Sequence, residues 1–267
     1  MALPAALPSS VLTESSIIQH PLSEVSSGGP GGATASATGI DGGTGDDTVL
    51  FDGLSLTAHS GSLIESTFDR FNAAGAISVD SILTAGSEAN CFVGGEGNDR
   101  FTLAGFSDVE AQSDVRISGG SLQFIGGTVT SSGVTAESVA IGASGGAGNN
   151  TIIFAPESDQ TVFSRAGVVA SNGTDIGFGG STSRAATIAE AVSYGVQGGA
   201  DDDIIQTAGN LSVISDTGST ARSVSFVLSG SGSTDLTANA SSTATGIAGG
   251  GGFNDIANSG NLVVSAN

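Results

Sequence analysis

"GGEGNDRF", residues 94–101, is one of five stretches in the chain that share two glycines, a third glycine or its substitute, an Asp or Asn, and an apolar residue. The five stretches align without gaps over twelve residues, and their first residues lie 52, 51, 53 and 51 positions apart. They begin at Gly42, Gly94, Gly145, Gly198 and Gly249. So regular a spacing is typical of a repeat protein, and we predict a repeat of about 52 residues.

Two positions of the repeated stretch carry the structural interpretation. The eighth position is apolar in every copy, which predicts a ladder of core side chains: Val49, Phe101, Ile152, Ile205 and Ile256. The sixth position predicts a turn ladder, made of Asp47, Asp99, Asn150, Asp203 and Asn254. Asp and Asn both suit a turn because they bond their own backbone and tolerate positive φ. The glycines indicate a tight corner without room for a Cβ atom.

The composition favours short strands and tight turns over helices. Gly accounts for 43 of 267 residues, charged residues for only 12%, and Val, Ile, Thr and Phe occur in short runs. Repeats of this kind cannot bury an apolar face individually, so they must stack. We therefore predict an all-β fold, a parallel β-solenoid of the β-helix or β-roll kind with about four short strands per repeat. The pattern leaves open one or two turns per repeat, and a β-sandwich array is the alternative.

The charge of the chain restricts its partners. Asp and Glu number 26 against six Arg and no Lys, and the net charge of −20 argues against nucleic acid and anionic membranes as partners. No apolar run reaches the length of a transmembrane helix. The single Cys91 excludes an internal disulfide framework, and its strand-like surroundings predict that it is buried. The first ten residues contain two prolines and no basic residue, so they do not form a clear signal peptide.

The repeated stretch resembles the Gly-Gly-x-Gly-x-Asp-x-apolar nonapeptide of the repeat-in-toxin (hemolysin-type calcium-binding) proteins. Residues 42–49 and 94–101 match this pattern well, whereas the other three copies lack its third glycine or its Asp. In that family the motifs follow one another directly, but here each stands alone about every 52 residues. The resemblance implies Ca²⁺ as a cofactor, held between loops of successive turns. The implied ligands are Asp46, Asp47, Asp99, Asp201, Asp202 and Asp203. A plain turn without metal is the alternative.

The sequence contains no catalytic constellation that we recognise. His20 and His59 fall in no known motif, and "SGSGS" at 229–233 lies among strands without an evident histidine partner. We therefore predict that the chain is not an enzyme. A polysaccharide lyase or hydrolase is kept as an alternative, because parallel β-helices host such enzymes.

The two ends of the chain predict assembly with other copies. We interpret residues 1–24 as an N-terminal arm able to donate a strand, since 11–19 is strand-like, and residues 25–267 as the solenoid. No amphipathic helix caps either end, and an open end recruits other chains. The expected assembly residues are Val11, Leu12, Ile17, Ile18, Leu262, Val263 and Val264.

These features predict a structural, self-assembling subunit that stacks head to tail into an extracellular or cell-surface filament. A head-to-tail contact that does not close produces an open fibre, so the partner would be the chain itself. The alternative from the resemblance is a calcium-stabilised, secreted adhesin or spacer, whose surface or carbohydrate partner the sequence does not identify.

Overall fold

The computed structural model describes residues 9–19 and 31–267, and all regular secondary structure in them is β-strand. The prediction of an all-β fold is therefore confirmed. The strands are β1 (Ser9–Gln19), β2 (Gly31–Asp41), β3 (Thr48–Val93), β4 (Arg100–Gly146), β5 (Thr151–Phe154), β6 (Asp159–Gly199), β7 (Ile204–Thr207), β8 (Asn210–Gly250), β9 (Asp255–Asn258) and β10 (Asn261–Ala266).

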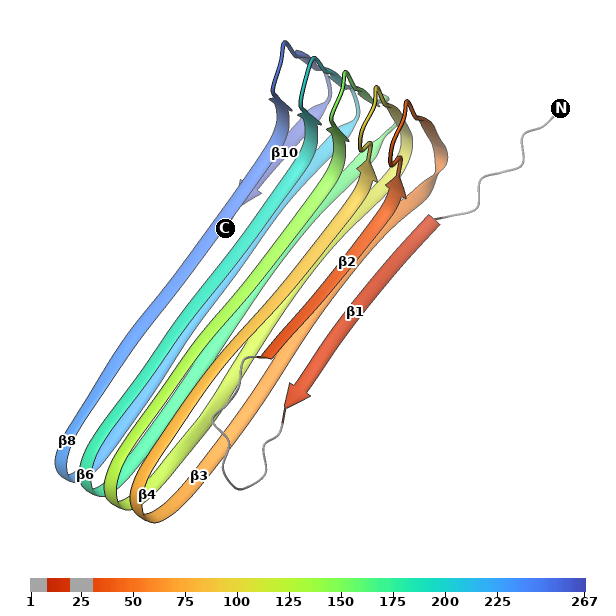
Figure 1. The fold of residues 1–267 in the computed structure, drawn as a ribbon. Helices are drawn as coiled ribbons and strands as arrows, with labels where there is room; N and C mark the ends of the chain where they lie inside the picture. The colour runs from red at the N-terminus through yellow and green to blue at the C-terminus, as the bar shows by residue number, and fades with distance from the viewer. Residues whose placement is uncertain (1–8, 20–30) are drawn as a thin grey trace.

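The strands pair in parallel, and the chain passes the same place once in each circuit (Figure 1). Thr48 pairs with Arg100, Arg100 with Thr151, and Thr151 with Ile204. The partners are thus separated by the same intervals as the repeated stretches of the sequence. Every pair between the described strands is parallel, which is consistent with a β-solenoid and argues against an antiparallel sandwich array.

The prediction of about four short strands per circuit is wrong. β3 and β4 contain 46 and 47 residues, and β6 and β8 contain 41 each. Each of these strands bends back on itself at a glycine whose φ lies between 121° and 139°: Gly75, Gly126, Gly179 and Gly230. Glycine reaches this conformation without a Cβ clash, so the pairing continues through the bend. We call these four sites the tip bends; they lie at the lower end of Figure 1.

Each circuit therefore has two long limbs with a narrow interior between them. Along β4 most alternate residues are buried, from Phe101 to Gln123 before the bend and from Thr128 to Ala140 after it. Successive side chains of a strand point to opposite faces, so one face of each limb forms the interior and the other meets solvent. The alternation of buried and solvent-facing residues along β4 arises from this two-limbed shape.

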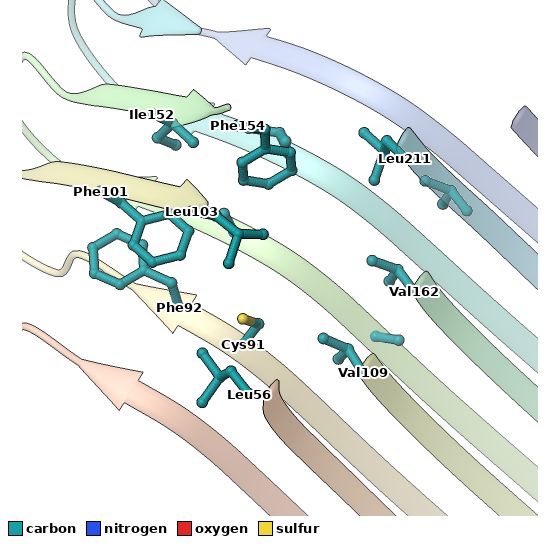
Figure 2. Close-up of a cluster of buried hydrophobic side chains, with 14 of the residues drawn as sticks. Leu56, Cys91, Phe92, Phe101, Leu103, Val109, Ile152, Phe154, Val162 and Leu211 are labelled. Carbon is teal, nitrogen blue, oxygen red and sulfur yellow. The ribbon is translucent and has the colours of Figure 1, made fainter. Parts of the chain in front are cut away.

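The interior contains two apolar clusters, and one of them lies near the end opposite the tip bends (Figure 2). Phe92 and Phe101 stack there with ring centroids 4.4 Å apart, and Phe154 meets Phe101 edge to face. Cys91 is fully buried in this cluster, as its surroundings predict. Burial raises the pKa of its thiol to about 12, although a hydrogen bond with Ser107 lowers it in part. This cluster fixes the limbs beside the repeated stretches.

Towards the tip bends, buried polar side chains share the interior with the second apolar cluster, which includes Ile64, Leu83 and Val134. The Thr130 hydroxyl donates to Ser183 Oγ at 3.0 Å, and Asn172 Nδ2 donates to Ser132 Oγ at 2.9 Å. All four side chains are buried. Hydroxyl groups that bond one another offset the loss of water, so Ser and Thr can replace aliphatic residues in this narrow interior. The abundance of Ser and Thr in the sequence thus has a structural role.

Candidate functional site

The repeated stretches form five loops that stack at the upper end of Figure 1. We call them the corner loops: residues 42–47, 94–99, 145–150, 198–203 and 249–254. The N–H of Glu96 donates to the Gly43 carbonyl at 2.8 Å, and the N–H of Ala147 donates to the Gly95 carbonyl at 2.8 Å. Each loop therefore continues the parallel hydrogen bonding of the strands on either side.

The sixth-position side chains join each corner loop to the loop before it. Asp99 Oδ1 accepts from the N–H of Asp47, and Asn150 Oδ1 accepts from the N–H of Asp99, both at 2.9 Å. Asp203 Oδ1 and Asn254 Oδ1 make the same bond, also at 2.9 Å, to the N–H of Asn150 and of Asp203. Both Asp and Asn have an Oδ1 atom that can accept this hydrogen bond, which explains why the sequence uses both residues at this position.

The fifth-position side chains form a second ladder in the opposite direction. Asp46 Oδ1 accepts from the N–H of Asn98 at 2.8 Å, and Asn98 Oδ1 accepts from the N–H of Asn149 at 2.9 Å. Asn149 Oδ1 and Asp202 Oδ1 extend it, accepting from the N–H of Asp202 at 3.0 Å and of Phe253 at 2.7 Å. Phe253 carries no acceptor, so the ladder ends there. The two ladders together fix each loop from both sides.

The first glycine of each corner loop makes room for the sixth-position side chain. A Cβ atom on Gly94 would lie 2.5 Å from Asp99 Oδ2, and one on Gly198 would lie closer still to Asp203 Oδ2. At the fourth loop position the copies with glycine have positive φ, and Asp201 adopts the same conformation at 70°. Asp201 is the one non-glycine residue with positive φ in the described part of the chain. The glycine pattern of the sequence therefore reflects close packing between loops.

The second oxygen of the sixth-position Asp residues is buried without a hydrogen-bond partner. This holds for Oδ2 of Asp47, Asp99 and Asp203 within residues 31–267. In the loops with Asn, the corresponding amide is satisfied: Asn150 Nδ2 donates to the Gly148 carbonyl at 2.9 Å. The corner loop thus presents a backbone carbonyl to which the amide of Asn can donate a hydrogen bond, whereas the carboxylate of Asp cannot.

The burial of Asp203 affects its ionisation. Burial raises the pKa of this carboxyl above its ordinary value, and the charges of Asp201 and Asp202 raise it further. Hydrogen bonds from Asn150 act in the opposite direction. Asp203 is 1% exposed, so water does not compensate its charge.

Replacing Asp203 by Asn is expected to stabilise the fold at neutral pH. Asn keeps the Oδ1 acceptor, and its Nδ2 supplies the donor that Asn150 and Asn254 already give to carbonyls of their loops. A buried polar atom without a partner costs about 1–3 kcal/mol, so the free energy of unfolding at pH 7 should rise by that order. Thermal unfolding of wild type and Asp203→Asn in EGTA measures the change.

The pH dependence gives a second readout of the same variant. A pKa that is higher in the folded chain means that protonation of Asp203 supports folding below about pH 3.9, the unfolded value. This support is lost as the pH rises through the folded pKa. The advantage of Asp203→Asn should therefore be small near pH 4 and grow towards pH 7. A pH-independent difference would contradict the argument, and a variant that is less stable than wild type only in calcium would make Asp203 a calcium ligand.

The carboxylates that the resemblance implies as calcium ligands lie in the corner loops but do not converge. Asp46, Asp47 and Asp99 are placed on two successive loops, and residues 201–203 share one loop. Within the described ranges no group of three or more His, Cys, Asp or Glu side chains could hold a metal ion. Calcium binding at these residues stays a prediction of the resemblance.

The eighth-position side chains stack directly beyond the corner loops. Val49 pairs with Phe101, Phe101 with Ile152, Ile152 with Ile205, and Ile205 with Ile256. The middle three are buried, and Val49 packs against their cluster. Ile256 is half exposed because β9 has no described strand on its other side.

The expected assembly residues lie on β1 and β10. Leu262 packs against the apolar cluster, while Val263 and Val264 are half exposed. The backbone of β1, which carries Val11, Leu12, Ile17 and Ile18, pairs with residues 56–66 of β3 in the same chain. The side chains of β1, and residues 1–8 and 20–24 of the predicted arm, lie outside what the structure describes, as does His20.

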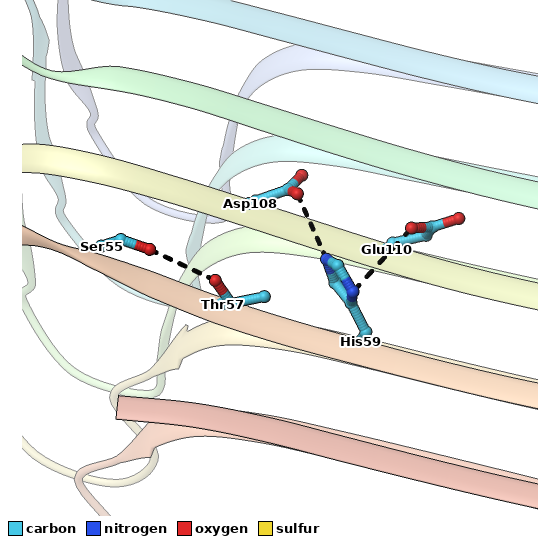
Figure 3. Close-up of polar contacts among 5 residues, drawn as sticks. All are labelled: Ser55, Thr57, His59, Asp108 and Glu110. Atoms are coloured by element: carbon cyan, nitrogen blue, oxygen red, sulfur yellow. Dashed lines mark hydrogen bonds and ion pairs between the residues drawn. The ribbon is translucent and has the colours of Figure 1, made fainter. Parts of the chain in front are cut away.

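One group of polar side chains on the outer face could not be recognised from the sequence. His59 on β3 lies with Nε2 3.2 Å from Asp108 Oδ2 and Nδ1 3.9 Å from Glu110 Oε2, both on β4 (Figure 3). Ser55 and Thr57 contact each other nearby at 3.4 Å. His59 reaches these acids only because one repeat makes one circuit, so that β3 and β4 are direct neighbours. Partly exposed ion pairs of this kind contribute little to stability.

Comparison with known proteins gives no further information on the function of the chain. Neither the protein-family models, nor the curated proteins, nor the solved structures contain a match. Among the residues that the structure describes, no helix is long and apolar enough to cross a membrane. The function is therefore inferred from the geometry of the stacked circuits.

Proposed function

We propose that this chain is a structural subunit, a parallel β-solenoid with one circuit per repeat, that stacks head to tail into a filament. The observation that carries the proposal is the open edge of β8. β10 pairs with Asn210–Ser215 of β8, and beyond Thr217 no described strand covers the side of β8 that faces away from β6. A long row of unpaired N–H and C=O groups is a template for another chain.

The opposite end of the molecule offers the matching edge. This edge is β2: Gly31 of β2 pairs with Leu83, and Leu83 corresponds through Val134 and Thr187 to Ala238 of β8. In this register the eleven residues of β2 from a second copy would pair with 238–248 of β8. β3, β4, β6 and β8 already pair with one another through equivalent edges in one register. The two ends are therefore complementary in the way that successive circuits are, and such a contact between copies would repeat without closing.

The corner loops support the same contact with specific hydrogen bonds. In the interior of the stack, the N–H of each sixth-position residue donates to Oδ1 of the next loop. At the C-terminal end this donor is the N–H of Asn254. In a head-to-tail contact, Asp47 Oδ1 of a second copy would take the position of its acceptor. The proposed location outside the cell or on its surface rests on the composition of the sequence alone.

Replacing Val264 by Pro is expected to prevent filament formation without unfolding the subunit. The N–H of Asn267 donates to Ser215 of β8, and alternate residues of a strand direct their N–H groups to the same side, so the N–H of Val264 points away from β8. In the circuit register Val264 corresponds to Ala58, so this N–H would face β3 of a second copy, where Pro removes the donor and its ring blocks pairing. Electron microscopy should show filaments of wild type and none of Val264→Pro.

Ser265→Pro is the matched control, because the N–H of Ser265 points back to β8. This variant should lower the melting temperature, whereas Val264→Pro should leave it nearly unchanged. Filaments of Val264→Pro as abundant as those of wild type would refute the stacking. The same microscopy in EGTA distinguishes the calcium-stabilised alternative, which expects wild-type filaments or a stable fold only when calcium is present.

A further inference from the structure

A ridge of exposed apolar side chains follows the tip bends. We call it the tip ridge, and it consists of Phe71, Phe124, Ile125, Phe178, Phe226 and Leu228, which are 56 to 69% exposed. The rings of Phe71 and Phe124 contact each other edge to face, with centroids 6.0 Å apart. The chain has 12 Phe and no Trp, so four exposed Phe at one end of the molecule are a marked concentration.

The tip ridge runs along the stacking direction. β3 contributes Phe71, β4 contributes Phe124 and Ile125, β6 contributes Phe178, and β8 contributes the last two. Ile125 and Phe178 are paired in register. Neighbouring circuits lie about 4.8 Å apart, so the ridge is a continuous strip that crosses all four long strands.

Charged residues border the tip ridge at only a few positions, since Asp69, Arg70 and Asp175 line the pocket beside Phe71. The segments 71–79, 117–136, 176–183 and 223–234 have no Asp, Glu, Lys or Arg, although the whole chain has a net charge of −20. Two copies repel each other over a surface of one dominant sign. Tip-to-tip contact is the approach that keeps the acids of two copies apart. The low charge of the strip therefore favours a second copy of this chain as its partner.

The size of the ridge is sufficient for a specific contact. With about 150–250 Å² for an aromatic side chain, the exposed fractions give on the order of 700 Å² of apolar surface, close to the roughly 800 Å² per partner of a standard interface. Apolar patches of this size on a soluble chain mark interaction sites. Asp175 interrupts the strip, since it is paired with Leu122 on one side and Phe226 on the other.

We propose that two copies of this chain associate side by side through their tip ridges. Both copies use the same patch, so the contact is isologous and closes as a pair. The pair does not depend on head-to-tail stacking. Where stacking also occurs, the product is a double filament joined along its tip bends.

The test uses the full chain with Val264→Pro, which removes the proposed stacking contact and leaves the tip ridge intact. Analytical ultracentrifugation should show a dimer of this chain. Adding Phe71→Ser, Phe124→Ser and Phe226→Ser should weaken dimerisation at least about ten-fold, since each tenfold change corresponds to only 1.4 kcal/mol. Adding Asp175→Asn should strengthen it, because a charge leaves the strip.

Phe106→Ser is the control, since Phe106 is also half exposed but lies at the other end of β4. This change should leave the dimer intact. A monomer of Val264→Pro, or a dimer unaffected by the three ridge changes, would overturn the proposal. Ridge-dependent binding of a monomer to phosphatidylcholine vesicles would replace the second copy by a lipid surface. In wild type, the ridge changes should convert double filaments to single ones, so failure of stacking and failure of pairing are distinguished.

Discussion

Gly179→Ala is expected to lower the free energy of unfolding by at least about 3 kcal/mol, the largest stability effect of any single change considered for this chain. Gly179 forms a tip bend with φ at 139°. A Cβ atom there would overlap the carbonyl oxygen of Gly126 in the preceding circuit. That oxygen belongs to the backbone and is fixed by the pairing on both sides, so it cannot move aside. Urea unfolding followed by circular dichroism measures the loss.

Gly218→Ala is the matched control for this prediction. Gly218 lies in the same sheet, in β8, but no atom lies within 4 Å of the position of its Cβ, and its φ is not positive. Ala at such a site reduces the freedom of the unfolded chain and is expected to be neutral or to stabilise by up to about 1 kcal/mol. Equal losses in both variants would mean that the column of tip bends is not what holds the limbs together.

The corner loops were predictable from the sequence, because several constraints act on the same six residues. The first glycine must clear the sixth-position side chain, the second and third must accept positive φ, and the sixth residue must offer Oδ1 to the preceding loop. Each constraint selects a few residue types, so the pattern is visible five times. The tip bends also recur, at Gly75, Gly126, Gly179 and Gly230. They need only one glycine each, which is a weak pattern in a chain with 43 glycines.

The contacts between circuits could not be predicted, because they depend on register. The sequence left open one or two turns per repeat, and only one turn brings Asp99 to the N–H of Asp47. The same register brings His59 to Asp108. The tip ridge could not be predicted from the sequence for another reason. Runs such as residues 121–125 and 224–228 have the composition of core strands, and only the bend shows which of their side chains face solvent.

Removing residues 1–19 is expected to shorten the lag of filament formation by about ten-fold or more, since each 1.4 kcal/mol removed from a barrier gives a factor of ten in rate. β1 pairs Ser9–Thr13 with Leu56–Ser60 of β3. In the circuit register, Leu262 corresponds to Leu211, and Leu211 corresponds through Gln160 and Ser107 to Leu56. The β10 strand of a second copy would therefore pair with Leu56–Ser60, which β1 already occupies.

The register of β1 indicates that it is the weaker occupant of this edge. Ser9 pairs with Leu56, 47 positions away, whereas Gly31 of β2 pairs with Leu83 at the interval of 52 that the circuits share. β10 keeps the circuit interval, since Asn261 pairs with Asn210. Assembly would then begin with exchange of β1 for the β10 strand of another copy. Light scattering during assembly, with filaments counted by electron microscopy, measures the lag.

Deletion of residues 1–8 alone is the control, because it leaves β1 in place and should leave the lag unchanged. If removing residues 1–19 instead abolished filaments, β1 would be a strand that each subunit donates to its neighbour, as the sequence of the arm predicts. The two roles predict opposite changes in the same measurement, because a strand that competes for the edge slows assembly and a donated strand is required for it. The competition for Leu56–Ser60 favours the first role.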